Sequence, residues 1–127
     1  MLNKVIQFTA LILIFLCISS CKQLRHGIDV TVTNVTSNTI YNITVEAGTD
    51  ALIEIDSLLS NTTVTKYLDM RQLPKIDGSY MVTFMLPHGE QFKEPYGYFT
   101  NGYPVNYELC LTIGDPTIFV TFDDFCE

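Results

Sequence analysis

Four cysteines and two histidines are the residues of this 127-residue sequence best suited to covalent or metal chemistry. A thiol can act as a nucleophile, ligate a metal or form a disulfide. The histidines are too few for a zinc site and are not spaced for one. The sequence also has no Gly-rich phosphate loop, no nucleophile elbow and no His-Glu-x-x-His run, so we expect no metal, no cofactor and no enzyme. These six residues are Cys17, Cys21, Cys110, Cys126, His26 and His88.

The residues before Cys21 have the features of an export signal. Lys4 precedes an apolar stretch from Phe8 to Ile18, and two serines stand immediately before Cys21. About ten apolar residues after a positive charge are typical of a secretory signal and too few for an ordinary membrane span. The alternative is an uncleaved N-terminal membrane helix. Either way the domain lies outside the cytoplasm.

The end of this segment resembles the lipobox of bacterial lipoproteins, because the aliphatic Ile18 lies three residues before Cys21 with small residues between them. The resemblance implies that residues 1–20 are a signal peptide and that Cys21 is lipidated and becomes the first residue after cleavage. Lys22, a residue other than Asp, resembles the outer-membrane sorting pattern of proteobacteria, which implies an anchor in the outer membrane facing the periplasm. Residues 21–27 would be a lipidated tether and residues 28–127 the domain.

The charge of the mature chain restricts its partners. Removing residues 1–20 leaves 107 residues, the size of one domain, with six basic and fourteen acidic side chains and therefore a formal charge of −8. Such a surface repels phosphate backbones, so we expect no nucleic-acid partner, and a partner steered by charge would be basic. Solubility alone is the simpler explanation of the acidic composition.

Cys110 and Cys126 remain after cleavage and lipidation, and an oxidising compartment favours a disulfide between them. If residues 114–116 form a hairpin turn, Cys110 faces a residue near Val120, and Cys126 lies six residues farther, about 20 Å away in an extended chain. The tail would have to curl back at Asp123 and Asp124 to bring the two Cα atoms within about 7 Å. The alternative is one buried cysteine and one free cysteine near the terminus.

Acidic residues gather at the C-terminus. They could surround calcium if the last hairpin brought them together, but no EF-hand spacing supports such a site. A solvated acidic end is the simpler interpretation, so no metal site is predicted there. The residues are Asp115, Asp123, Asp124 and Glu127.

The segment from Pro95 to Pro104 concentrates aromatic rings among glycines and prolines and predicts a loop. Rigid aromatic side chains provide a large contact area at a small entropy cost, so the loop is a candidate surface for a protein or a sugar ring. The alternative is that the rings plug the end of the fold, and we expect a mixture in which Phe99 is buried and Tyr98 or Tyr103 is exposed. The candidate binding residues are Tyr96, Tyr98, Phe99, Asn101 and Tyr103.

Period-two alternation of apolar and polar residues runs through the mature chain, with no helical period. The alternation predicts seven or eight short strands, the first two paired as a hairpin. The segment 105–113 is expected to form one long apolar face through Val105, Tyr107, Leu109, Leu111 and Ile113. The predicted strands cover residues 28–35, 41–46, 51–55, 62–69, 80–84, 91–93, 105–113 and 117–122.

Residues 73–84 resemble the corner between two strands of immunoglobulin-like and fibronectin type III domains, where a turn with Asp and Gly precedes a Tyr. The resemblance implies that the hydroxyl of Tyr80 bonds to the backbone upstream. The expected fold is therefore all-β, an antiparallel immunoglobulin-like β-sandwich of seven or eight strands after the N-terminal signal segment.

Three function classes are compatible with these features. The first is a membrane-anchored, non-catalytic binding module for an envelope protein, a format shared with immunity or inhibitor lipoproteins. The second is a carbohydrate-contacting or structural component of the cell envelope. The third, an enzyme, lacks any catalytic motif in the sequence.

Overall fold

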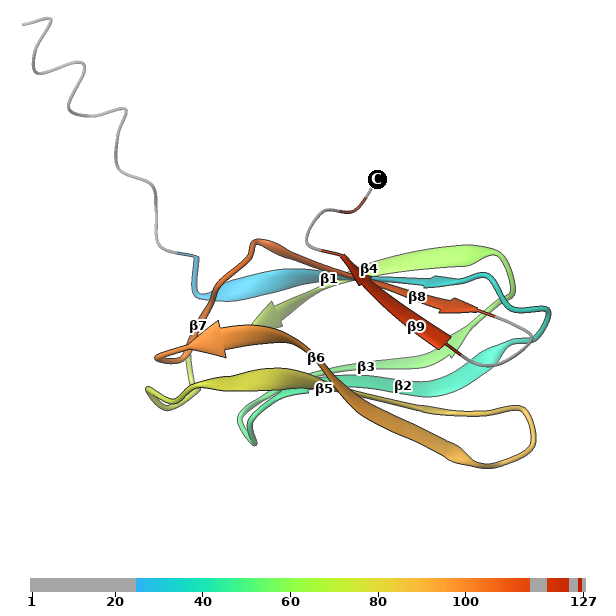
Figure 1. Ribbon diagram of the computed structural model, residues 1–127, viewed down its shortest axis with the longest axis horizontal. Helices are drawn as coiled ribbons and strands as arrows, with labels where there is room; N and C mark the ends of the chain where they lie inside the picture. The colour runs from blue at the N-terminus through green and yellow to red at the C-terminus, as the bar shows by residue number, and fades with distance from the viewer. Residues whose placement is uncertain (1–24, 115–118, 124–125, 127) are drawn as a thin grey trace, which may run out of the picture.

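The computed structural model describes residues 25–114, 119–123 and 126 of the chain (Figure 1). These residues form nine strands and no helix. They therefore include no helix that could cross a membrane. The strands are β1 (Gly27–Asn34), β2 (Ile40–Ala47), β3 (Ala51–Leu58), β4 (Thr62–Asp69), β5 (Gly78–Met85), β6 (Gln91–Thr100), β7 (Tyr103–Pro104), β8 (Glu108–Gly114) and β9 (Phe119–Asp123).

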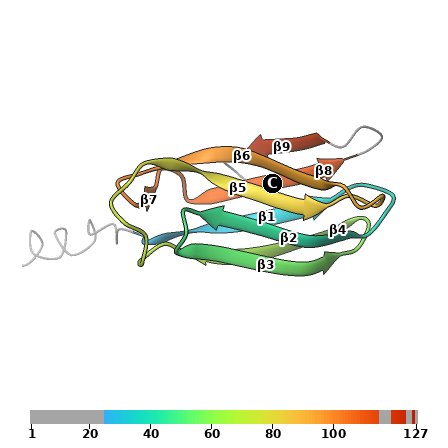
Figure 2. The same ribbon diagram turned by 90° about the horizontal axis from the view of Figure 1, so that it is seen from below.

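The strands form two sheets that face each other, with the orders β4-β1-β8-β9 and β3-β2-β5-β6-β7 (Figure 2). The predicted all-β sandwich is confirmed. Eight strands match the predicted segments, and the ninth is the two-residue β7. All pairs are antiparallel except β1 with β8, which are parallel. No short turn joins β1 to β8, so nothing local imposes an antiparallel arrangement on this pair.

The predicted hairpin between the first two strands is wrong, because β1 pairs with β4 and β8 while β2 pairs with β3 and β5. The connection between β1 and β2 instead crosses from one sheet to the other. Buried Asn34 holds this crossing: its side chain donates to the carbonyls of Asn38 and Leu58 and accepts from the backbone and hydroxyl of Thr36. Alternation shows that one face of a strand is buried, but it does not identify the neighbouring strand.

The core consists of alternate side chains from the inner faces of both sheets, and its largest members are Tyr80, Phe84 and Phe99. The apolar face predicted for residues 105–113 extends over only half of that segment. Leu109 and its alternate neighbours in β8 are buried, but Val105 and Tyr107 precede the strand and are 54% and 57% exposed. They lie in bends that carry the chain from the five-stranded to the four-stranded sheet.

The side chain of Tyr80 is buried, as a corner tyrosine would be, but its hydroxyl donates to the sulfur of Met70 at 3.8 Å. The predicted bond to the upstream backbone is therefore wrong. The backbone of Met70 is itself bonded, its N–H to His26 and its carbonyl to the N–H of Leu73, which fixes the residue above the tyrosine. Burial raises the pKa of Tyr80, so the phenol stays protonated and serves as a donor.

The two ends of the sandwich carry different connections. We call the end where β1 begins the tether end, because Arg25 and His26 of the expected tether lie there. It contains the connections 48–50, 70–77 and 101–107, of which the last two are linked by a hydrogen bond from the N–H of Gly102 to the carbonyl of Ile76 (Figure 1). The opposite end, called the far end, contains the connections 35–39, 59–61 and 86–90.

Candidate functional site

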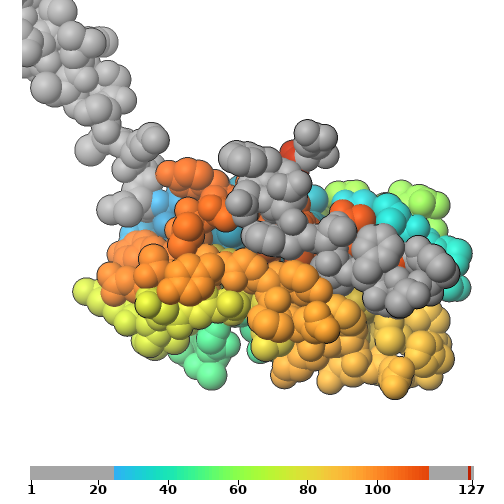
Figure 3. All heavy atoms as spheres, in the orientation of Figure 1, coloured from blue at the N-terminus to red at the C-terminus, as the bar shows by residue number. Residues whose placement is uncertain are grey.

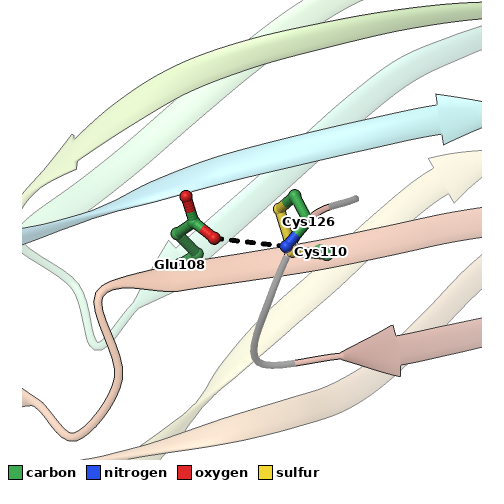
Figure 4. A group of neighbouring side chains, drawn as sticks. All are labelled: Glu108, Cys110 and Cys126. Carbon is green, nitrogen blue, oxygen red and sulfur yellow. Dashed lines mark hydrogen bonds between the residues drawn. A yellow bond between two sulfur atoms is a disulfide. The ribbon is translucent and has the colours of Figure 1, made fainter.

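The structure joins Cys110 of β8 and Cys126 in a disulfide with Cα atoms 5.4 Å apart (Figure 4). The backbone N–H of Cys126 also donates to Glu108 at 3.2 Å. The register predicted from a turn at 114–116 is wrong, because Cys110 lies opposite Asp123, not Val120. Gly114 pairs with Phe119, so four residues separate the paired positions. Cys126 is therefore only three residues beyond the partner of Cys110. The chain after β9 has to span only a short distance to form the disulfide.

Glu108, Cys110 and Cys126 bring a carboxylate and two sulfurs within 4.8 Å of one another, the spacing of a metal site. Both sulfurs are in the disulfide, however, and only a thiolate ligates a metal well. No other cluster of potential ligands occurs in the described part of the chain. The acidic C-terminal group lies outside that part: residues 115, 124 and 127 and the side chain of Asp123 are not described. The same holds for Cys21.

The two histidines lie at opposite ends of the sandwich and cannot share a site. His26 is exposed at the tether end and packs on Tyr103 with the two rings tilted by 48° and their centroids 5.1 Å apart. His88 is exposed at the far end, with its Nε2 atom 3.0 Å from Glu90. Neither imidazole lies in a cluster of potential metal ligands among residues 25–114.

The segment from Pro95 to Pro104 is not the predicted loop but the β6–β7 hairpin. Gly97, at φ +62°, lies in a register shift where β6 carries one extra residue opposite β5. A Cβ at Gly97 would lie 3.1 Å from the Tyr80 ring. Asn101 and Gly102, both at positive φ, form a two-residue turn. The Asn-Gly pair is a strong hairpin signal that could have predicted this structure.

Asp77 holds this turn from the neighbouring connection. One carboxylate oxygen accepts from the N–H of Asn101 and from the hydroxyl of Thr100, both at 2.8 Å. These bonds favour the charged form and lower the pKa of Asp77, the Asn101 bond most. The carboxylate therefore stabilises the turn of the hairpin.

The predicted binding residues divide between core and surface. Phe99 is 2% exposed and packs on the Tyr80 ring at 5.5 Å, whereas Tyr98 is 48% exposed. Tyr96 is half-buried against the core and donates to Glu94 at 3.4 Å, and Tyr103 is half-buried beneath His26. Asn101 is exposed at the turn. The aromatic side chains of the hairpin therefore serve mainly to close the core, and Tyr98 and Asn101 are the exposed members of the predicted set.

The structure also brings together a surface that the sequence did not predict. Tyr98 shares the tether end with four other exposed side chains from β4 and from the connections on either side of the hairpin, and we call this group the aromatic end. Figure 3 shows where the yellow-green 70–77 connection meets the orange 101–107 connection. The aromatic end consists of Tyr67, Ile76, Tyr98, Val105 and Tyr107, which are 44% to 57% exposed.

A second surface lies on the outward side of the five-stranded sheet. Glu54 and Asp56 point outward from edge strand β3, and Glu46 points outward from the adjacent β2. These three residues form what we call the acidic face, and none of them forms an ion pair within the described residues. The free edge beside them is partly covered, because Lys66 of β4 donates to the carbonyl of Glu54 at 2.5 Å.

No family model matches the sequence, and no curated protein matches it. A protein from Eubacterium rectale whose structure was determined by NMR is similar in fold. The two structures superpose with a TM-score of 0.55 over 84% of this chain and 97% of that chain, at 14% sequence identity. At this identity the likeness shows the fold alone, an all-β sandwich.

Proposed function

We propose that this protein is a membrane-anchored extracytoplasmic lipoprotein that binds a protein partner in the cell envelope and has no catalytic activity. The observation that carries the proposal is the lipobox-like run ending at Cys21, directly before a small acidic sandwich. Immunity and inhibitor lipoproteins have the same size and location, which is an analogy and not a relationship.

The acidic face is the surface that we assign to this partner. Its three carboxylates stand on adjacent strands of a sheet, so their positions are fixed by the ladder between β2 and β3. Exposed charges of one sign steer the encounter with a protein of opposite charge, and they need little rearrangement to bind it. The partner would therefore present lysine or arginine side chains. Because Lys66 occupies the Glu54 carbonyl at the edge, the partner would approach the face of the sheet and not extend it by a strand.

A charge-matched pair of variants tests this assignment. The protein would be recovered from solubilised membranes with its bound partners, and Glu54→Gln with Asp56→Asn should lose a stoichiometric basic partner. Glu90→Gln with Glu94→Gln removes the same charge from exposed positions elsewhere and should retain it. Equal recovery with both variants would show that the acidic face is not the site.

The anchor has a separate test. Cys21→Ser should accumulate as an unlipidated, uncleaved precursor, because in the lipoproteins that it resembles the sulfur is acylated before the signal is removed. Cys17→Ser, four residues earlier in the same segment, is the control and should be processed normally. Incorporation of a fatty-acid analogue that Cys21→Ser leaves unchanged would contradict the anchor.

A carbohydrate-contacting or structural role in the envelope is the alternative. One observation favours it: Tyr98 and Asn101 expose a ring and an amide close together on the hairpin, a combination that can stack on a sugar and hydrogen-bond to it. Retention of the purified domain on peptidoglycan or polysaccharide, lost in Tyr98→Ala, would support this role. In that case no stoichiometric protein partner is expected.

A further inference from the structure

The exposed apolar side chains are unevenly distributed over the sandwich. Nine large apolar or aromatic side chains are at least 44% exposed among the described residues, and five of them form the aromatic end. They come from four separate parts of the chain, so their proximity is a product of the fold and not of a local sequence bias. Tyr67 lies on the outward side of the four-stranded sheet and Tyr98 on that of the five-stranded sheet, so the five side chains surround this end of the sandwich. Exposed apolar side chains gathered in one region commonly mark a contact with a protein or a membrane.

Two ion pairs lie beside the aromatic end. Arg25 pairs with Asp29 at 2.8 Å and lies over the Tyr67 ring at 5.6 Å, and Arg71 pairs with Asp69 at 2.5 Å. Hydrogen bonding to Arg71 lowers the pKa of Asp69, so this pair stays charged at neutral pH. Exposed tyrosines with paired arginines beside them suit an interface that is apolar on one side and aqueous on the other.

The position of the expected tether indicates that this interface is the membrane surface. Cys21 precedes Arg25 by four residues, which span at most about 14 Å when fully extended. Arg25 lies at the tether end, against Tyr67. If Cys21 carries acyl chains, as proposed above, this end of the sandwich is held within that distance of the lipid headgroups, whereas the far end lies at the other end of the strands.

We propose that the aromatic end is a membrane-docking surface that seats the domain on the headgroup region of the bilayer. Tyrosines are enriched at membrane interfaces because their rings sit among the upper acyl carbons while their hydroxyls reach water. Tethering raises the local concentration of the surface, so weak contacts are sufficient. Because the chain is strongly acidic and its nearby arginines are paired, the attraction comes from apolar burial and not from anionic lipids.

Docking in this way would also orient the acidic face. The strands run from the tether end to the far end, so the outward side of the five-stranded sheet would rise from the membrane and face the periplasm laterally. The acidic carboxylates would then be held away from the headgroups and accessible to a partner.

Tryptophan reporters test the contact between the aromatic end and the membrane directly, because the natural chain has no tryptophan. Residues 21–127 would be coupled through the Cys21 thiol to a maleimide lipid in phosphatidylcholine vesicles, with Cys110 and Cys126 protected by their disulfide. A Tyr107→Trp reporter should shift its emission to shorter wavelength and be quenched by brominated lipids. A Leu59→Trp reporter at the far end, where the natural leucine is 63% exposed, should do neither.

Two further measurements test whether the quenching comes from apolar contacts of the aromatic end. Val105→Ser with Tyr98→Ser in the Tyr107→Trp background should reduce the quenching, provided that the denaturation midpoint shows a folded domain. Replacing part of the phosphatidylcholine with phosphatidylglycerol should leave the quenching unchanged. Equal quenching of the Tyr107→Trp and Leu59→Trp reporters would overturn the proposal. Since chemical coupling replaces biological lipidation, that result would leave the lipoprotein assignment intact, which the Cys21→Ser labelling tests separately.

Discussion

The outward faces of the two sheets use their polar groups differently. On the four-stranded sheet, the hydroxyls of β1 and β4 bond to each other, Thr31 to Thr65 at 2.8 Å and Thr33 to Thr63 at 3.0 Å. Cys110 on the same face is tied to Cys126. On the five-stranded sheet, the acidic face has carboxylates without ion pairs in the described part of the chain.

This difference indicates which face can bind a partner. Groups already bonded within the protein must break those bonds before they form new ones, so they contribute little net free energy to association. Exposed carboxylates without ion pairs have to give up only their bonds to water when a partner binds. The four-stranded face therefore contributes mainly to stability, and the five-stranded face is the better candidate for recognition.

The largest expected effect on stability comes from a substitution in the core between the two sheets. Phe99→Ala removes a buried ring that contacts Tyr80 and should lower the free energy of unfolding by about 3 to 5 kcal/mol. Tyr98→Ala, one residue earlier and on the outward side, is the control and should change it by about 0.5 kcal/mol or less. Urea denaturation measures both. Similar losses for the two variants would mean that the outward side also contributes to packing.

The disulfide should contribute the next largest effect. Cys110→Ser with Cys126→Ser opens a bridge of sequence separation 16, and a loop of this length predicts a loss of about 3 kcal/mol. The loss would be confined to stability, since the bridge lies on the four-stranded sheet and away from the acidic face. Partner recovery that falls with this variant while the domain remains folded would break the division between the two faces.

The sequence predicted the kind of fold well because period-two alternation is a local property. Each of the eight predicted strands overlaps an observed one, since buried and exposed residues must alternate wherever one side of a strand faces the other sheet. The pairing of the strands was harder to predict from the sequence. Nothing in residues 28–46 shows that the chain crosses between sheets, because the crossing depends on the bond from Asn34 to Leu58, 24 positions away.

The candidate sites show the same limit. The exposure of Glu54 and Asp56 follows from their alternation with buried Ile53 and Ile55, but the addition of Glu46 needs the register of β2 with β3. The aromatic end required even more, because its residues come from separate connections. The disulfide depended on the number of residues in one turn, which shifted the partner of Cys110 by three positions from the one expected.

A smaller effect is expected from the threonine pairs. Thr31→Val and Thr65→Val, made singly and together, should show a coupling free energy of about 0.2 to 1 kcal/mol, since they lie directly opposite and share a hydrogen bond. A second cycle that combines Thr31→Val with Thr44→Val, on the other sheet, should show none. Denaturation curves of the four proteins in each cycle supply the measurement. Zero coupling in the first cycle would remove the argument that these hydroxyls stabilise the face.

The smallest effect on stability, and the most informative, is expected at the acidic face. Glu54→Gln with Asp56→Asn should leave the free energy of unfolding within about 0.5 kcal/mol of the parent protein, because both side chains are exposed and neither forms an ion pair in the described residues. Removing two negative charges from a sequence of formal charge −7 also relieves repulsion, which opposes any loss. If partner recovery falls while the denaturation midpoint is unchanged, the carboxylates act in the complex and not in the fold. A large drop in the midpoint would instead show that the five-stranded face is as important to stability as the threonine face, and the contrast between the two sheets would fail.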